Sequence, residues 1–120
     1  MPATFKRFRH HRVDAATRFA WRDTHLTPDV YIWPVFLVAG HDRREPIEAM
    51  PEVYRYSTDR LCAELDRLMP LGLQAVLLFG VPAEKGIEQA WAGDGIVQTA
   101  IPVLKARFPG LEIITDVCLC

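Results

Sequence analysis

The sequence predicts an α/β fold in which parallel strands alternate with helices. A run rich in β-branched and aromatic residues at 30–38, and a run at 74–80 that is apolar with almost no polar alternation, are typical of strands. A helical repeat of leucines lies between them, and a second helical pattern leads into a third apolar run at 111–118. This alternation indicates right-handed βαβ units in a parallel sheet.

The first predicted strand lies within 30–38 and contains a proline. Pro34 has no backbone N–H to donate to a sheet, so we expect the strand to begin near it or to bulge there. The polar stretch 40–52 carries two further prolines and predicts a loop or a short hairpin.

The first predicted helix follows Ser57, a residue type that favours the N-cap position. Pro70 interrupts its last turn and Gly72 ends it. Its apolar positions recur at helical spacing and define one buried face: Leu61, Leu65, Leu68 and Met69.

The second half of the chain repeats the pattern. The run 74–80 has almost no polar alternation, so we expect a parallel strand covered on both faces. After a loop, Asp94 is the predicted cap of a second helix, which Pro102 should kink. The apolar face of that helix comprises Ile96, Val97, Ala100, Ile101 and Leu104.

Three parallel strands and two helices leave one sheet edge and much of one face bare. Natural α/β domains cover such edges and faces with further strands and helices, either in a larger open sheet or in an eight-stranded barrel of about 250 residues. Because the last predicted strand runs almost to Cys120, we expect the 120 residues to be the N-terminal part of a longer protein.

Charge divides the chain into two parts. Residues 1–22 hold six basic residues and one acidic residue, whereas the remainder holds 8 basic and 14 acidic residues. The basic part also carries four large aromatic side chains: Phe5, Phe8, Phe19 and Trp21. We expect this arm to pack on another subunit; packing on its own body and binding of nucleic acid stay open as alternatives.

Membrane and secreted classes are not indicated. No apolar run approaches the roughly 18 residues of a membrane-spanning helix. The N-terminus lacks the apolar core and cleavage site of a secretory signal, so we expect a cytoplasmic protein. Cys62 falls in a helical pattern and is expected to be buried, and Lys85 and Lys105 are expected to be solvated. Trp91 is expected to pack rather than to bind a ligand.

The residues best suited to catalysis or metal binding lie at the end of the third predicted strand. Asp116, Cys118 and Cys120 alternate, so a strand would point them to one side, at the carboxyl end where α/β active sites are assembled. Two thiols can share one zinc ion, which needs at least three protein ligands. The third would come from beyond residue 120 or from a histidine: His10, His11, His25 or His41. Two structural cysteines, or an accidental pair, are the alternatives.

The segment from Ile114 to Cys120 resembles the zinc-cysteine segment of the delta-aminolevulinic acid dehydratase (porphobilinogen synthase) family. The likeness extends in order along nearly the whole chain. The other similar segments are 26–29, 33–36, 45–55, 76–82 and 90–101.

The resemblance implies a fold and an activity. The fold is a TIM (β/α)8 barrel, with residues 29–120 forming its first β/α units. An extended N-terminal arm, residues 1–28, would embrace a neighbouring subunit in a homo-oligomer, usually an octamer, without nucleic acid. The family condenses two molecules of 5-aminolevulinate into porphobilinogen in tetrapyrrole (heme) biosynthesis. Two lysines form Schiff bases with the substrates, and zinc held by three cysteines acts on the second substrate.

Residue by residue, Cys118 and Cys120 match the first two zinc ligands and Asp116 matches the active-site aspartate. The third cysteine and both lysines would lie beyond residue 120, so the resemblance predicts that the 120-residue chain alone is inactive. Magnesium is an allosteric ion in many relatives. Glu88 and Gln89 replace a common Gly-Ser pair, a departure from the family pattern. A non-enzymatic partial barrel that drives assembly, or a small metal-binding protein, is the alternative.

Overall fold

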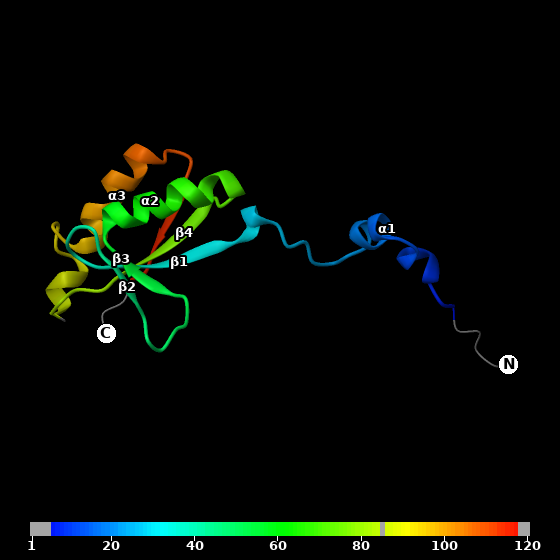
Figure 1. Ribbon diagram of the computed structural model, residues 1–120, viewed down its shortest axis with the longest axis horizontal. Coiled ribbons are helices and arrows are strands. Elements are labelled where there is room, and N and C mark those ends of the chain that lie inside the picture. Colours follow the sequence, from blue (N-terminus) through cyan, green and yellow to red (C-terminus); the bar gives the residue numbers. More distant parts are fainter. Residues whose placement is uncertain (1–5, 85, 118–120) are drawn as a thin grey trace.

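The computed structural model describes residues 6–84 and 86–117 and shows a twisted sheet with two helices on one face (Figure 1). The strands are β1 (Ile32–Leu37), β2 (Arg44–Pro46), β3 (Tyr54–Tyr56), β4 (Ala75–Gly80) and β5 (Glu112–Thr115). The α-helices are α1 (Ala15–Ala20), α2 (Thr58–Leu68) and α3 (Ile96–Arg107). Short 3-10 helices complete the described elements: η1 (Arg9–Arg12), η2 (Pro28–Val30), η3 (Met69–Leu71) and η4 (Ile87–Ala90).

The sheet confirms the α/β prediction. Its strand order is β2-β3-β1-β4-β5, and every neighbouring pair is parallel except β2 and β3, which form an antiparallel hairpin. The hairpin confirms one of the two forms expected for 40–52. Its second strand, however, pairs in parallel with the end of β1, which the sequence pattern did not predict.

Pro34 lies inside β1 without a bulge, and the hydrogen-bond direction explains why. The N–H of Val38 donates to Tyr56 of β3, and the carbonyl of Leu37 accepts from Val81 on the β4 side. Because alternate residues of a parallel strand bond to opposite neighbours, the nitrogen of Pro34 also points toward the β3 side. Strand β3 pairs only with Phe36 and Leu37, so no ladder bond is lost at Pro34.

The predicted N-cap of α2 is confirmed, whereas the α-helix ends at Leu68 and the 3-10 helix η3 continues to the predicted stop at Gly72. Ser57 is the N-cap, but its hydroxyl oxygen accepts from the backbone N–H of Arg43 (3.0 Å) rather than from the helix. This bond ties the start of the helix to the β2–β3 hairpin. At the other end, Gly72 adopts the left-handed conformation, with φ of 101°, in which a side chain is disfavoured.

Two predicted boundaries were wrong. Helix α3 is capped by Gly95, not Asp94, because the carbonyl of Gly95 accepts the helix's first bond, from the N–H of Thr99 (2.9 Å). The third strand ends at Thr115 rather than at 118, since Asp116 makes one backbone bond to β4 and the regular ladder then stops. Pro102 lies inside α3 as predicted.

The core lies between the sheet and the helices α2 and α3. Residues with no measurable exposure come from both layers: Leu37, Val76 and Leu78 from strands, and Leu61, Leu65 and Leu104 from helices. Cys62 is buried as expected, and burial raises the pKa of its thiol. Lys105 is exposed as expected, Lys85 lies outside the described residues, and Trp91 is 71% exposed, so its predicted packing was wrong.

The opposite face of the sheet, which we call the open face, carries no helix of the described residues (Figure 1). Ile32 is 52% exposed there, and Leu77 and Phe79 are half-buried. The expected bare face is therefore confirmed. Within the described residues, 74–80 is covered by helices on one face only, because α2 and α3 pack on the same side, so coverage of its other face stays a prediction.

The N-terminal arm extends away from the body (Figure 1). The radius of gyration is 21.1 Å, compared with about 14 Å for a compact domain of this length. Phe8, Phe19 and Trp21 are each more than half exposed, so packing on its own body is not seen. Within the arm, the rings of His11 and Trp21 stack at 3.9 Å. No helix in the described residues is long and apolar enough to cross a membrane.

Candidate functional site

Five side-chain positions, four from β1 to β4 and one from the residue that follows β5, share one level at the carboxyl edge of the parallel strands. The register pairs Glu45 with Arg55, Arg55 with Phe36, and Phe36 with Phe79. Asp116 follows Thr115, the partner of Leu78, and is therefore level with Phe79. We call these five residues the edge row: Glu45, Arg55, Phe36, Phe79 and Asp116.

The edge row belongs to the open face because side chains alternate along each strand. In β1, Val35 and Leu37 are buried against the helices, so Phe36 between them points the other way. In β3, Tyr56 is buried in the same core and Arg55 takes the opposite side. The row is thus a strip of two aromatic rings flanked by charged groups.

The aromatic centre of the row is well defined. The rings of Phe36 and Phe79 stack with centroids 5.3 Å apart and an interplanar angle of 23°. Both are half-buried although no described element covers them. They form an apolar platform between the cationic end of the row and Asp116.

Asp116 is exposed at the far end of the row and is held by its backbone. Its N–H donates to the carbonyl of Leu78 (3.2 Å), which extends the β4–β5 pairing by one residue. Its carboxylate makes no hydrogen bond or ion pair with the described residues. The carboxylate is therefore available to a ligand.

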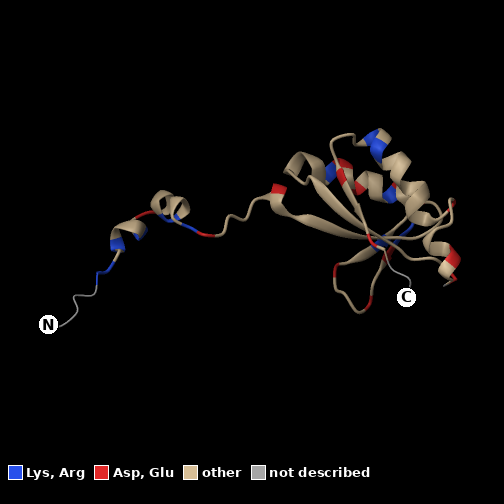
Figure 2. Ribbon diagram, turned by 180° about the vertical axis from the view of Figure 1, so that it is seen from behind, with Lys and Arg blue, Asp and Glu red and all other residues tan. Residues whose placement is uncertain are grey.

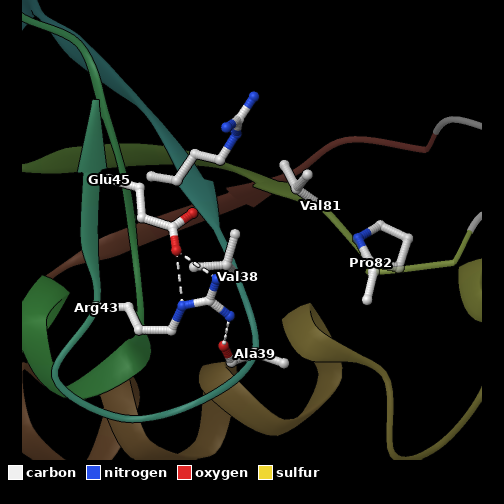
Figure 3. A pocket seen from close by; sticks show the side chains of 8 residues that line it. Val38, Ala39, Arg43, Glu45, Val81 and Pro82 are labelled. Carbon is white, nitrogen blue, oxygen red and sulfur yellow. Dashed lines mark hydrogen bonds and ion pairs between the residues drawn. The ribbon is translucent and has the colours of Figure 1, made fainter. Parts of the chain in front are cut away.

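Beside the other end of the row lies Arg43, which is not part of the row and donates one hydrogen bond from each of its three guanidinium nitrogens. Arg43 donates from Nε to Glu45 Oε1 (2.8 Å), from Nη2 to the same oxygen, and from Nη1 to the carbonyl of Ala39 (2.9 Å). Figure 3 shows these bonds beside a cavity of about 160 Å³, with Val81 and Pro82 on its other side. The cavity lies just beyond the carboxyl ends of β1 and β4.

Arg55 also lines this cavity and differs from Arg43. It is half-buried, and no carboxylate of the described residues lies within 4.0 Å of its guanidinium. Two guanidinium groups and one carboxylate therefore border the cavity, leaving one net positive charge. A small anion is the ligand that such a lining favours.

Side chains of α2 hold the loop that precedes β2 in place. The backbone N–H of Asp42 donates to Asp59 Oδ2 (2.9 Å), and Arg60 Nε pairs with Asp42 Oδ1 at 2.5 Å. A hydrogen bond from the Ser57 side chain and then the Asp42 N–H lower the pKa of Asp59. These contacts hold the loop that presents the Ala39 carbonyl to Arg43.

The predicted metal ligands are only partly placed. Cys118 and Cys120 lie outside the described residues, whereas Asp116 directly follows the last residue of β5, one position beyond the strand in which it was expected to lie. Within 6–84 and 86–117, no three histidine, cysteine, aspartate or glutamate side chains gather to hold an ion. Two thiols two residues apart, adjoining an acid at a strand's exit, remain a donor set that suits zinc.

Sequence reasoning missed the cationic half of the site. The signal was available in the alternation Tyr54-Arg55-Tyr56, in which one charged residue separates two aromatic ones. That pattern predicts a strand with Arg55 on the face opposite the core. Three residues are too short a pattern to distinguish this strand from the neighbouring loop.

Comparisons with known proteins agree on one family. The family model described as "Delta-aminolevulinic acid dehydratase" matches residues 5–120. A protein of that name from Halalkalibacterium halodurans is 45% identical over 98% of this chain, and one from Bacillus subtilis is 38% identical over the whole chain. The chain spans only 36% and 38% of the lengths of these two relatives.

A solved structure is similar along almost the whole chain. It is the delta-aminolevulinic acid dehydratase (porphobilinogen synthase) of Toxoplasma gondii ME49, in complex with the reaction product porphobilinogen. The TM-score is 0.84 at 27% identity, covering 98% of this chain and 34% of that protein. The predicted fold, the N-terminal part of a TIM barrel preceded by an extended arm, is confirmed.

Proposed function

Because the chain belongs to the delta-aminolevulinic acid dehydratase family, we propose that its full-length protein condenses two molecules of 5-aminolevulinate into porphobilinogen, with release of two waters. The observation that carries this proposal is the family match over residues 5–120, which includes Asp116, Cys118 and Cys120. The structural likeness to a product-bound relative supports the same reaction. The pathway served would be tetrapyrrole (heme) biosynthesis.

The proposed site residues are Asp116, Cys118 and Cys120. The two thiolates would hold zinc together with a third cysteine beyond residue 120, since thiolate is the ligand that zinc favours. When bound there, zinc would supply a Lewis acid for the substrate oxygen or amine. Asp116, whose carboxylate is free in the described residues, would orient the substrate amine or accept its proton.

The division of the chain is also part of the proposal. Residues 29–120 would supply the first β/α units of the barrel, and residues 1–28 would dock on a second copy in a homo-oligomer, an octamer by family likeness. The exposed aromatic side chains of the arm support this, as does its charge, which is opposite to that of the body (Figure 2). The location would be cytoplasmic, with magnesium as a further allosteric ion.

Two measurements test these proposals. Purified full-length protein is supplied with 5-aminolevulinate, and the appearance of porphobilinogen is followed by its colour reaction. We expect turnover that falls on chelation and returns with added zinc, and no turnover by the 120-residue chain, which would lack the Schiff-base lysines. Absence of product from zinc-loaded full-length protein would contradict the proposed function.

The arm is tested by removing residues 2–28 and measuring the mass in solution by light scattering. We expect a smaller assembly than the intact protein forms. An unchanged mass, or an arm that binds nucleic acid in preference to a second copy, would contradict the assignment of the arm.

A further inference from the structure

We propose that Pro34 and Pro46 protect the sheet from pairing with other protein chains before the barrel closes. Pro34 lies inside β1 and Pro46 lies inside β2. The proposal depends on the barrel fold shared with the solved relative and not on the proposed reaction.

One side of the sheet has two strand edges that none of the described strands covers. Strand β2 lies at the end of the order β2-β3-β1-β4-β5, so its outer edge is unpaired. Strand β3 pairs only with Phe36 and Leu37 of β1, so residues 32–35 are also unpaired on that side. We call the outer edge of β2 and this part of β1 the lateral edge. Unpaired N–H and C=O groups along such an edge are a template for pairing with another chain.

The nitrogen of Pro34 faces the lateral edge. Residues of a parallel strand bond alternately to its two neighbours, and the N–H of Val38 donates to the carbonyl of Tyr56 in β3 (2.9 Å). Pro34 and Val38 are separated by an even number of positions, so Pro34 faces the same side. Because proline has no N–H, Ile32 is the only one of residues 32–35 that presents a backbone donor to this edge.

The nitrogen of Pro46 faces the lateral edge as well. The N–H of Ser57 donates to the carbonyl of Arg43 (3.0 Å), and the N–H of Ile47 donates to the carbonyl of Val53 (3.0 Å). Positions 43 and 47 therefore bond across the hairpin, and alternation directs Pro46 outward. The short strand β2 is left with a single outward N–H.

The segment that contains β1 would otherwise pair readily with other chains. The run 30–38 has no charged residue, and its composition is typical of segments that form intermolecular β-sheets. Tyr31 and Ile32, at its start, are 51% and 52% exposed. An apolar groove of about 480 Å³, lined in part by Trp33 and Leu71, lies beside it. A proline whose nitrogen faces the edge removes a hydrogen bond from any such pairing.

The order of synthesis explains why the prolines lie on this side. In a closed eight-stranded barrel the first strand pairs with the last. The chain spans only 36% and 38% of the lengths of two relatives, so the partner of β1 would be made long after β1 itself. The opposite edge, β5, would pair with the next strand along the chain, and Glu112–Thr115 contains no proline. Pro34 therefore lies on the edge that is covered last.

The experiment measures association between chains during refolding of the full-length protein. Pro34→Val returns the missing N–H and keeps an apolar side chain that suits a strand. The wild type and the variant are unfolded in urea and diluted to two micromolar concentrations about tenfold apart, and the soluble fraction is measured. At the higher concentration we expect about threefold less soluble protein from the variant, and at the lower concentration equal yields. The insoluble material should show intermolecular β-sheet by infrared spectroscopy.

Three further variants serve as matched controls. Pro46→Val and Pro46→Lys both return an N–H at an exposed position of β2, but the charge of lysine opposes pairing between edges. We expect the valine variant to lose soluble yield and the lysine variant to keep it. Pro109→Val replaces an exposed proline in the turn between α3 and β5 and should refold as the wild type does. If Pro34→Val loses the same fraction at both concentrations, the loss arises within one chain, and the two Pro46 variants decide the question.

Three results would overturn the proposal. Refolding of Pro34→Val with the wild-type yield at both concentrations would show that the missing N–H has no protective role. Equal yields from Pro46→Val and Pro46→Lys would show that pairing at the edge is not the cause of any loss. A loss from Pro109→Val as large as that from Pro34→Val would assign the effect to the removal of any proline. Soluble protein is measured without turnover, so the result is independent of whether the protein forms porphobilinogen.

Discussion

Replacing Glu52 with glycine should stabilise the protein, although the change removes a side chain. Glu52 lies in the turn between β2 and β3, where the N–H of Val53 donates to the carbonyl of Met50 (3.1 Å). Pro51 occupies the second position of this turn, and Glu52 the third, with φ of 66°. These are the marks of a type II turn, whose third position requires a positive φ and favours glycine.

The expected magnitude follows from two opposing terms. A left-handed conformation costs a non-glycine residue about 1–2 kcal/mol, which Glu52→Gly would recover. The greater freedom of glycine in the unfolded chain offsets about 0.4–1 kcal/mol of that gain. Glu52 is exposed and has no ion pair among the described residues, so no contact is lost. The midpoints of these two ranges leave a net stabilisation of about 0.8 kcal/mol.

The assay is urea unfolding, compared with a matched control in the same hairpin loop. Glu48 is also exposed, and its φ is not positive, so Glu48→Gly brings the same loss of charge without relief of strain. We expect that control to lower the free energy of unfolding by about 0.5–1 kcal/mol. Opposite signs for the two glutamates are the prediction. A Glu52→Gly variant that is destabilised as much as the control would refute the strained turn.

Four other predictions follow from the site and the core. Asp116→Asn in the full-length protein should lower kcat by about a hundredfold or more, as for loss of an acid–base group, and unchanged turnover would remove Asp116 from the mechanism. Cys118→Ser should reduce the zinc content found by metal analysis, and a full complement of zinc would argue against its role as a ligand. Leu104→Ala should cost about 2–5 kcal/mol of unfolding free energy because Leu104 is fully buried, against less than about 0.5 kcal/mol for Val103→Ala, which is 50% exposed; equal losses would contradict the placement of α3. Because the pKa of Asp59 is lowered in the folded state, its carboxylate stabilises the fold at pH values above its ordinary pKa of 3.8. This contribution is lost as the pH falls through the folded-state pKa, so Asp59→Asn should make the free energy of unfolding less dependent on pH in the acid range.

The fold was predictable where the hydrophobic period was long. The leucine repeat of α2 and the apolar run of β4 each extend over enough residues to define their element. The failures fall on short elements and on boundaries. Strand β3 has three residues, and its pairing with β1 depends on the hairpin's position in space, which no local pattern encodes.

The site divides in the same way. The position of Asp116 near the carboxyl edge was predictable because alternation and strand polarity are local rules, whereas its role in the reaction stays a proposal. The surroundings of Arg55 were not predictable, because they depend on which groups Arg43 bonds, and those bonds depend on a loop held by α2. Local sequence patterns predict where a side chain points, whereas its partners depend on the packing of distant segments.

The open face shows why polar groups would concentrate at the carboxyl edge of the complete barrel. The register defines three levels across β1, β4 and β5: Ile32, Ala75 and Glu112; then Pro34, Leu77 and Ile114; then Phe36, Phe79 and Asp116. The middle level contains no polar side chain, so in a closed barrel it would form a dry layer beneath the edge row. A carboxylate at the upper level would then face the barrel mouth rather than the interior. The apolar middle level therefore separates the polar side chains of the edge row, Asp116 and Arg55 among them, from the other end of the strands.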